Sequence, residues 1–189
     1  MRADIAASGL LAILSLAALP RLATAQHEHE HARRAESDTA FAAMQSRGKS
    51  AMGVDQYTSV HRFDALPDGG RIELQRAVDD SAGVAQIRSH LRAIADAFAA
   101  GDFGTPAFVH LRQVPGTAVM AAKRSAITYD VRDLPRGAEL RITTRDPAAL
   151  SAVHEFMAFQ RMDHRAEGTH DGAASSPHEH SVEESRSPR

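Results

Sequence analysis

The chain contains no cysteine and no tryptophan, and aromatic side chains make up 5% of its 189 residues. Without cysteine there are no disulfide bonds, no thiolate ligands and no thiol nucleophiles, so the fold has to rest on burial of apolar side chains. A bound metal would have to be held by histidine, carboxylate, methionine or backbone groups. These absences narrow both the source of stability and the chemistry that a site can use.

Charge of one sign and the common catalytic motifs are lacking as well. The formal net charge is −2 at pH 7, so no basic surface of the kind that binds nucleic acid is expected. There is no Gly-x-Ser-x-Gly elbow and no glycine-rich phosphate loop, and Asp68-Gly69-Gly70 is typical of a hairpin turn. His154-Glu155 has no second histidine four residues on, and the His-Glu pairs of the terminal tracts are expected outside helices, which argues against a zinc-peptidase helix.

The N-terminus carries an apolar run, Ile5 to Leu19, that is too short for a permanent membrane anchor. Small residues follow at Ala23-Thr24-Ala25, which is the pattern of signal-peptidase cleavage after Ala25. The sequence therefore predicts a signal peptide over residues 1–25. We expect a periplasmic or secreted protein with no membrane attachment after cleavage.

Composition divides the rest of the chain into three parts. Residues 26–49 are polar and alanine-rich, and predict a histidine-containing tether with a short helix around Thr39 to Gln45. Residues 50–165 have the length and apolar content of one domain. Residues 166–189 are dominated by Gly, Ser, Pro and charged residues, which predicts a disordered tail.

Within the domain, one order of elements occurs twice. Alternating residues predict a hairpin of Tyr57–Leu66 with Arg71–Val78, and a helix with apolar residues every three or four positions then ends at Gly101. A second hairpin begins near Ile127, and its helix is capped by Asp146 and runs to about residue 164. We predict an α+β fold of duplicated ββα units, with a four-stranded antiparallel sheet and helices packed against it. The connection over residues 102–124 is irregular, apart from a short helix at Thr117–Arg124, and a loop of this length tends to be functional.

Histidine is concentrated at the two ends of the mature chain. Imidazole is the commonest metal ligand in proteins, and alternating histidine and glutamate suits divalent copper, zinc or nickel. The alternative is a solvated polar tract that binds metal only adventitiously. The candidate metal ligands in these tracts are His27, His29 and His31, and, near the other end, His178 and His180, with His170 close by.

Four histidines lie inside the predicted domain: His61, His90, His110 and His154. His90 and His154 take similar places beside the apolar stripes of the two helices, so a twofold relation between the repeats would bring them together. His110 and Met120, from the long connection, would complete a metal site for copper or zinc. The alternative reading is that each histidine is a hydrogen-bonded core residue, because neutral imidazole donates one bond and accepts one.

A further set of short runs is spread over residues 52–165. The runs are Met52-Gly53-Val54-Asp55-Gln56, His61-Arg62-Phe63, Gly69-Gly70, Ile87-Arg88-Ser89-His90-Leu91, Gly101-Asp102-Phe103, Pro106, His110, Pro115-Gly116, Met120, Ile142-Thr143-Thr144, His154-Glu155-Phe156, Phe159-Gln160 and Asp163-His164. Together they resemble a family of small exported bacterial proteins of uncharacterised function, sometimes labelled aspartate carbamoyltransferase.

The resemblance implies that the core histidines and Met120 belong to a shared pattern, and it implies no reaction. The family has a second histidine where this chain has Arg62, which weakens a metal site built on that pair. The chain is too short for a two-domain transcarbamoylase and has no Ser-Thr-Arg-Thr-Arg phosphate loop, so that activity is not expected.

Three functions follow from these observations. The first is an exported metal-binding protein for copper or zinc, acting as a sink, carrier or sensor. The second is a non-enzymatic module that forms a homodimer or docks a partner, with its histidine-rich ends as linkers. The third is a hydrolase or transferase that uses a core histidine as a general base.

Overall fold

The computed structural model describes residues 19–53 and 58–166, with side chains from Glu30 onward. These residues belong to two units that divide between Met44 and Gln45. The first unit holds most of helix α1 (Leu19–Met52), whose side chains from Glu30 to Ala40 are exposed. The second unit begins with the end of α1 and contains the sheet. No helix in the described part of the chain is both long and apolar enough to cross a membrane.

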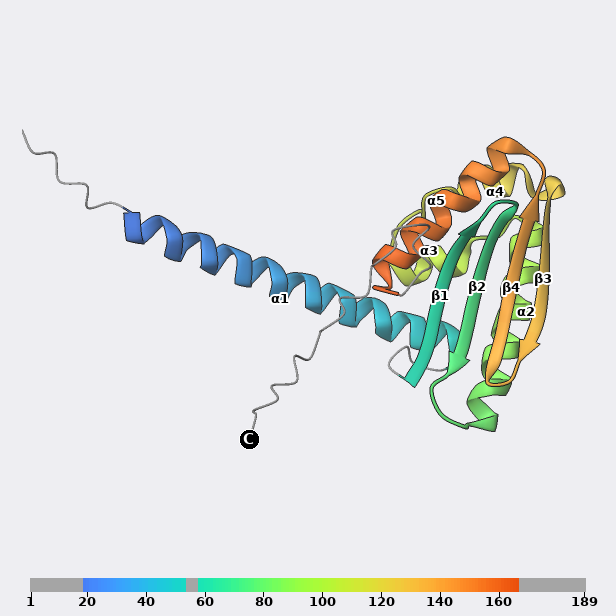
Figure 1. Ribbon diagram of the computed structural model, residues 1–189, viewed down its shortest axis with the longest axis horizontal. Helices are drawn as coiled ribbons and strands as arrows, with labels where there is room; N and C mark the ends of the chain where they lie inside the picture. Colours follow the sequence, from blue (N-terminus) through green and yellow to red (C-terminus); the bar gives the residue numbers. More distant parts are fainter. Residues whose placement is uncertain (1–18, 54–57, 167–189) are drawn as a thin grey trace, which may run out of the picture. The chain divides into compact units, whose positions relative to one another are not determined.

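The second unit contains the same order of elements twice, which confirms the predicted α+β class and the duplicated ββα pattern (Figure 1). The two turns align, Leu66-Pro67-Asp68-Gly69 with Leu134-Pro135-Arg136-Gly137. The first repeat is β1 (Ser59–Leu66), β2 (Gly69–Arg76) and α2 (Ser81–Ala100), and the second is β3 (Ile127–Leu134), β4 (Gly137–Thr144) and α5 (Pro147–Asp163).

The four strands form one antiparallel sheet in the order β1-β2-β4-β3. Strands β2 and β4 pair at its centre, where Ile72 lies opposite Leu140. Because side chains alternate along a strand, one face of the sheet is apolar and the other carries charged residues such as Arg71 and Glu73. The apolar face is the side on which the core forms.

The helix of each repeat covers mainly the hairpin of the other repeat. Helix α2 packs on β3 and β4, and α5 packs on β1 and β2 (Figure 1). The largest fully buried side chains include Phe98 of α2 and Phe156 of α5, whose rings meet edge to face at 5.8 Å. This exchange of helices ties the repeats into one core.

The helix termini follow the signals read from the sequence. The Asp80 side chain accepts a hydrogen bond from the backbone N–H of Gly83, and Asp146 accepts from those of Ala148 and Ala149. Gly101 ends α2 in the left-handed conformation, with φ of 84°. The predicted cap of the second helix and the end of the first are therefore confirmed.

Three expectations about local structure need correction. The hairpin turns contain only two residues, so β2 begins at Gly69, two positions before the predicted Arg71. The connection over residues 102–124 holds the predicted short helix as α4 (Thr117–Ala122), but also an unpredicted one, α3 (Gly104–His110). Helix α1 runs through all of residues 26–49, where the sequence predicts a tether with one short helix. Alanine, glutamate and arginine are strong helix formers, and their abundance in this segment explains the longer helix.

The central strand pair leaves no space for a side chain where β2 begins. A Cβ on Gly69 would lie 1.9 Å from the carbonyl oxygen of Ile142, and Gly69 has a φ of 151°. We expect Gly69→Ala to lower the free energy of unfolding by roughly 2 kcal/mol or more, measured by urea denaturation.

Gly48→Ala serves as the matched control, because nothing lies within 4 Å of a Cβ at that helical position. It should be neutral or stabilising by up to about 1 kcal/mol, since alanine favours helix. A Gly69→Ala protein as stable as the Gly48→Ala protein would contradict the close approach of β2 and β4.

Candidate functional site

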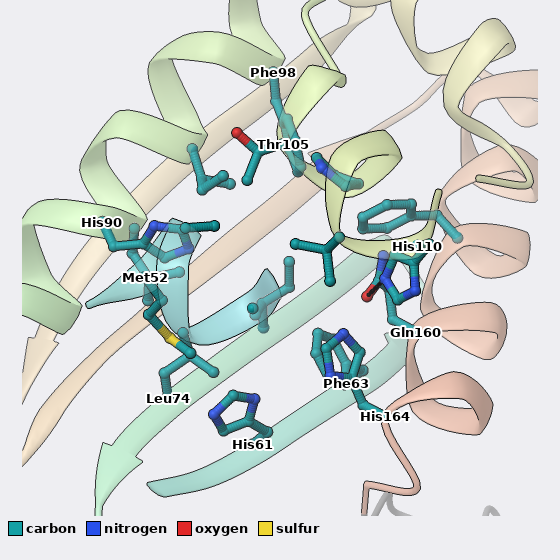
Figure 2. A pocket seen from close by; sticks show the side chains of 18 residues that line it. Met52, His61, Phe63, Leu74, His90, Phe98, Thr105, His110, Gln160 and His164 are labelled. Carbon is teal, nitrogen blue, oxygen red and sulfur yellow. Dashed lines mark hydrogen bonds between the residues drawn. The ribbon is translucent and has the colours of Figure 1, made fainter. Parts of the chain in front are cut away.

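A pocket opens between the helices, over the inner face of β1 and β2 (Figure 2). Its cavity volume, measured with a water-sized sphere, is about 90 Å³, which is enough for an ion or a few water molecules. Most of its wall is apolar, from residues such as Leu91, Ile94 and Phe98. The polar groups are few, and most of them are imidazoles: those of His61, His90, His110 and His164.

The four histidines come from four different elements. His61 is on β1, where alternation turns it to the buried face beside Phe63. His90 is on α2, and His110 is the last residue of α3. His164 caps the C-terminus of α5, where its backbone N–H donates to the carbonyl of Gln160. The fold therefore collects at one pocket residues that are far apart in the sequence.

Three of the rings lie close together. The centroid of the His164 ring is 5.1 Å from that of His110 and 6.0 Å from that of His61. Phe63 packs against the His164 ring at 5.3 Å. His61, His110 and His164 are each less than 10% exposed, so water contributes little to the solvation of this cluster.

Burial and mutual repulsion keep two of these rings neutral. Burial lowers the pKa of His61 to about 4, with a smaller contribution from His90. Burial likewise lowers the pKa of His164 to about 3, assisted by His110 and His61. Among the described residues, the Nε2 atom of His61 is buried without any hydrogen-bond partner. A buried ring nitrogen without a partner costs free energy, and a bound water or ion is one way in which such an atom is satisfied.

His110 is held in a defined orientation. Its Nδ1 lies 2.5 Å from Asp163 Oδ2, and its Nε2 lies 3.1 Å from the amide oxygen position of Gln160. If Nδ1 donates to the carboxylate, neutral imidazole keeps a lone pair on Nε2, and the Gln160 amide can turn its NH₂ group toward it. A histidine arranged in this way can ligate a metal or accept a proton.

His90 lies on the opposite wall of the pocket, against the end of α1. Its ring hydrogen-bonds the backbone of Ala51, while burial lowers its pKa. Arg47 makes a second link from α1, because its Nε donates to the carbonyl of Val109 at 2.7 Å. The last turns of α1 thus form part of the pocket wall, through Gly48, Ala51 and Met52.

Two residues of the predicted core site lie elsewhere. The ring of His154 hydrogen-bonds the carbonyl of Leu66 at 2.9 Å, at the end of the first hairpin. Met120 is fully buried in the apolar core and does not line the pocket. The expected meeting of His90 with His154 does not occur, because they are not equivalent: His90 is the tenth residue after its cap Asp80, and His154 the eighth after Asp146.

His164 is the pocket histidine that the predicted site omits. It follows the last residue of α5, beyond the apolar stripe by which the sequence predicts that helix. A signal was available all the same: Gln160 and His164 are one helical turn apart, so both project toward the same side of α5 as the buried Phe156.

The predictions for the terminal histidine tracts are tested only in part by the described residues. His27, His29 and His31 lie within α1, so the expectation that these His-Glu pairs stand outside a helix is wrong. His27 and His31 are four residues apart, a spacing that places both positions on one face of a helix. The His31 side chain is exposed. His170, His178 and His180 lie outside the described residues, as do residues 1–18 of the predicted signal peptide.

The described side chains of the pocket do not converge on a common metal position. Within residues 19–53 and 58–166, no group of three or more histidine, aspartate or glutamate side chains converges on a metal position. Comparison with known proteins adds no assignment, since no protein-family model, curated protein or solved structure matches the chain. The geometry and chemistry of the pocket are therefore the basis for any functional proposal.

The lowered pKa values of His61 and His164 predict a loss of stability in acid. Between pH 6.5 and about 4 the unfolded chain binds protons at these positions that the folded chain does not, so the free energy of unfolding falls as the pH falls. We expect a loss on the order of a few kcal/mol over this window, and none from these groups above it. Urea denaturation at a series of pH values measures it.

The contribution of the two rings is isolated by substitution. A His61→Gln, His164→Gln double variant should lose less stability between pH 6.5 and 4 than the unchanged chain. His31→Gln, at an exposed position, should keep the full loss. An identical pH dependence in the double variant and the unchanged chain would show that these rings are not the groups that titrate on unfolding.

Proposed function

We propose that this protein binds a transition-metal ion, copper or zinc, in the pocket through His61, His110 and His164. In this function it serves as an exported sink, carrier or sensor, in keeping with the signal peptide that the sequence predicts. The observation that carries the proposal is the buried group of three imidazoles, one of which has a ring nitrogen without a partner.

The spacing of the rings is compatible with a shared ion. Two imidazoles bound to one tetrahedral metal at about 2.0–2.1 Å have ring centres roughly 5 Å apart. In the structure the ring centres of His110 and His164 are 5.1 Å apart, and those of His61 and His164 are 6.0 Å apart. Binding therefore requires the rings to turn about their side-chain bonds.

The protonation states also favour metal binding. A histidine ligates a metal only when the coordinating nitrogen is free of its proton, so metal affinity falls when the ring is protonated. The low pKa values of His61 and His164 keep both rings neutral at pH 7. In many metal sites a carboxylate accepts a hydrogen bond from the second ring nitrogen of a ligating histidine and so orients the ring. Asp163, which contacts Nδ1 of His110, is positioned for this role.

The ligand atoms of the pocket favour a transition metal over calcium or magnesium. Those hard cations need six or more oxygen ligands, whereas this pocket offers imidazole nitrogens. Copper and zinc accept imidazole nitrogen as a ligand. The low-dielectric wall also restricts the access of water to the ion.

The test is a titration of the full chain after the terminal histidines have been replaced. With His27, His29, His31, His170, His178 and His180 changed to Gln, we expect one equivalent of Zn(II) or Cu(II) to bind, measured by calorimetry with a competing chelator. His61→Gln or His164→Gln in this background should weaken binding at least tenfold.

His154→Gln is the matched control, because His154 is a part-buried histidine of the same domain that bonds Leu66 outside the pocket. Its metal affinity should stay within twofold of the background. Loss of all binding when the terminal histidines are replaced would place the metal in the tracts alone, and the docking-module function would then be preferred for the domain.

A further inference from the structure

The end of α1 brings a sulfur atom into the histidine pocket. Met52 is the last residue of α1, is half-buried, and lines the pocket together with His61 and His90. In the view of Figure 2 its side chain runs between these two rings, with the sulfur on the pocket side near Leu74. The Met52 thioether is thus the soft donor atom among the groups that line the pocket.

The position of Met52 is fixed from two sides. The His90 ring hydrogen-bonds the backbone of Ala51, the residue before it. Arg47, one turn and a residue earlier on α1, donates to the carbonyl of Val109 at 2.7 Å, which ties the helix to α3. These two links hold the last turn of α1 against the pocket, so the thioether is directed to it by the backbone as well as by apolar packing.

We infer that the pocket selects a soft monovalent cation, Cu(I), with the thioether of Met52 as a fourth ligand beside the imidazoles of His61, His110 and His164. The inference rests on the proposed metal function and names the ion. Thioether and imidazole together are ligands of monovalent copper, whereas zinc gains little from a neutral thioether.

Two features of the pocket fit this ion. The ligands are neutral, so the charge to be buried is one unit, half of that which a divalent ion would bring into the apolar wall. No carboxylate lines the pocket to neutralise a divalent ion, and Asp163 contacts Nδ1 of His110.

The test compares two cations in the background that lacks the terminal histidines. Ag(I) serves as a redox-inert substitute for Cu(I), and Zn(II) as the divalent ion. Met52→Leu conserves the side-chain volume and removes only the sulfur, so the fold should be kept, which circular dichroism checks. We expect it to weaken Ag(I) binding at least tenfold and Zn(II) binding less than twofold.

Met162→Leu is the matched control, because Met162 is 71% exposed on α5 and does not line the pocket. It should change neither affinity. X-ray absorption of the Cu(I)-loaded protein should detect a sulfur neighbour that Met52→Leu removes.

The possible failures are distinguishable. If Met52→Leu binds Ag(I) as tightly as the background while Zn(II) still depends on His61 and His164, the thioether is only a core filler and the inference is wrong, but the proposed metal function stands. If neither cation binds in the background, the proposed function itself is wrong.

Discussion

The pairing of β2 with β4 is the constraint on which the rest of the second unit depends. A single hairpin is marginally stable in water, and the central ladder joins two of them into a sheet with one continuous apolar face. The ladder brings the backbones together so closely that Gly69 and Gly137, the equivalent first residues of β2 and β4, each face a carbonyl oxygen of the neighbouring strand. Because each helix then crosses to the other hairpin, neither repeat has a complete core alone.

The pocket shows where the two repeats have diverged. His61 on β1 and Tyr129 on β3 are equivalent positions, each two residues into its strand and facing the core. Tyr129 packs edge to face on Phe98, and burial raises its pKa. His61 instead faces the space that α3, α5 and the end of α1 enclose. A symmetric sheet thus carries its candidate site over one hairpin, where α1 and α3 add walls that the other hairpin lacks.

Elements with strong local signals could be predicted from the sequence. Alternation predicts the two hairpins, and the spacing of apolar residues predicts α2 and α5. The signals at Gly101 and Asp146 act within one helical turn of their own positions, so they can be read locally. The helix in the polar, alanine-rich segment was harder to predict, because its apolar residues follow no clear helical pattern. The helix propensity of its residues was the one indication of α1. Helix α3 is seven residues long and depends on tertiary packing, which no local pattern reveals.

The site is less predictable because it depends on which side chains meet. Of the five predicted core residues, His61, His90 and His110 reach the pocket, while His154 and Met120 serve the hairpin end and the core. The difference between His90 and His154 follows from two helical positions, which rotate a side chain by roughly 200° about the helix axis. Because residues from six elements line the pocket, a difference of two helical positions decides whether a side chain reaches it. Residue type can indicate metal chemistry in a sequence, but the choice of ligands is made by the packing of the helices on the sheet.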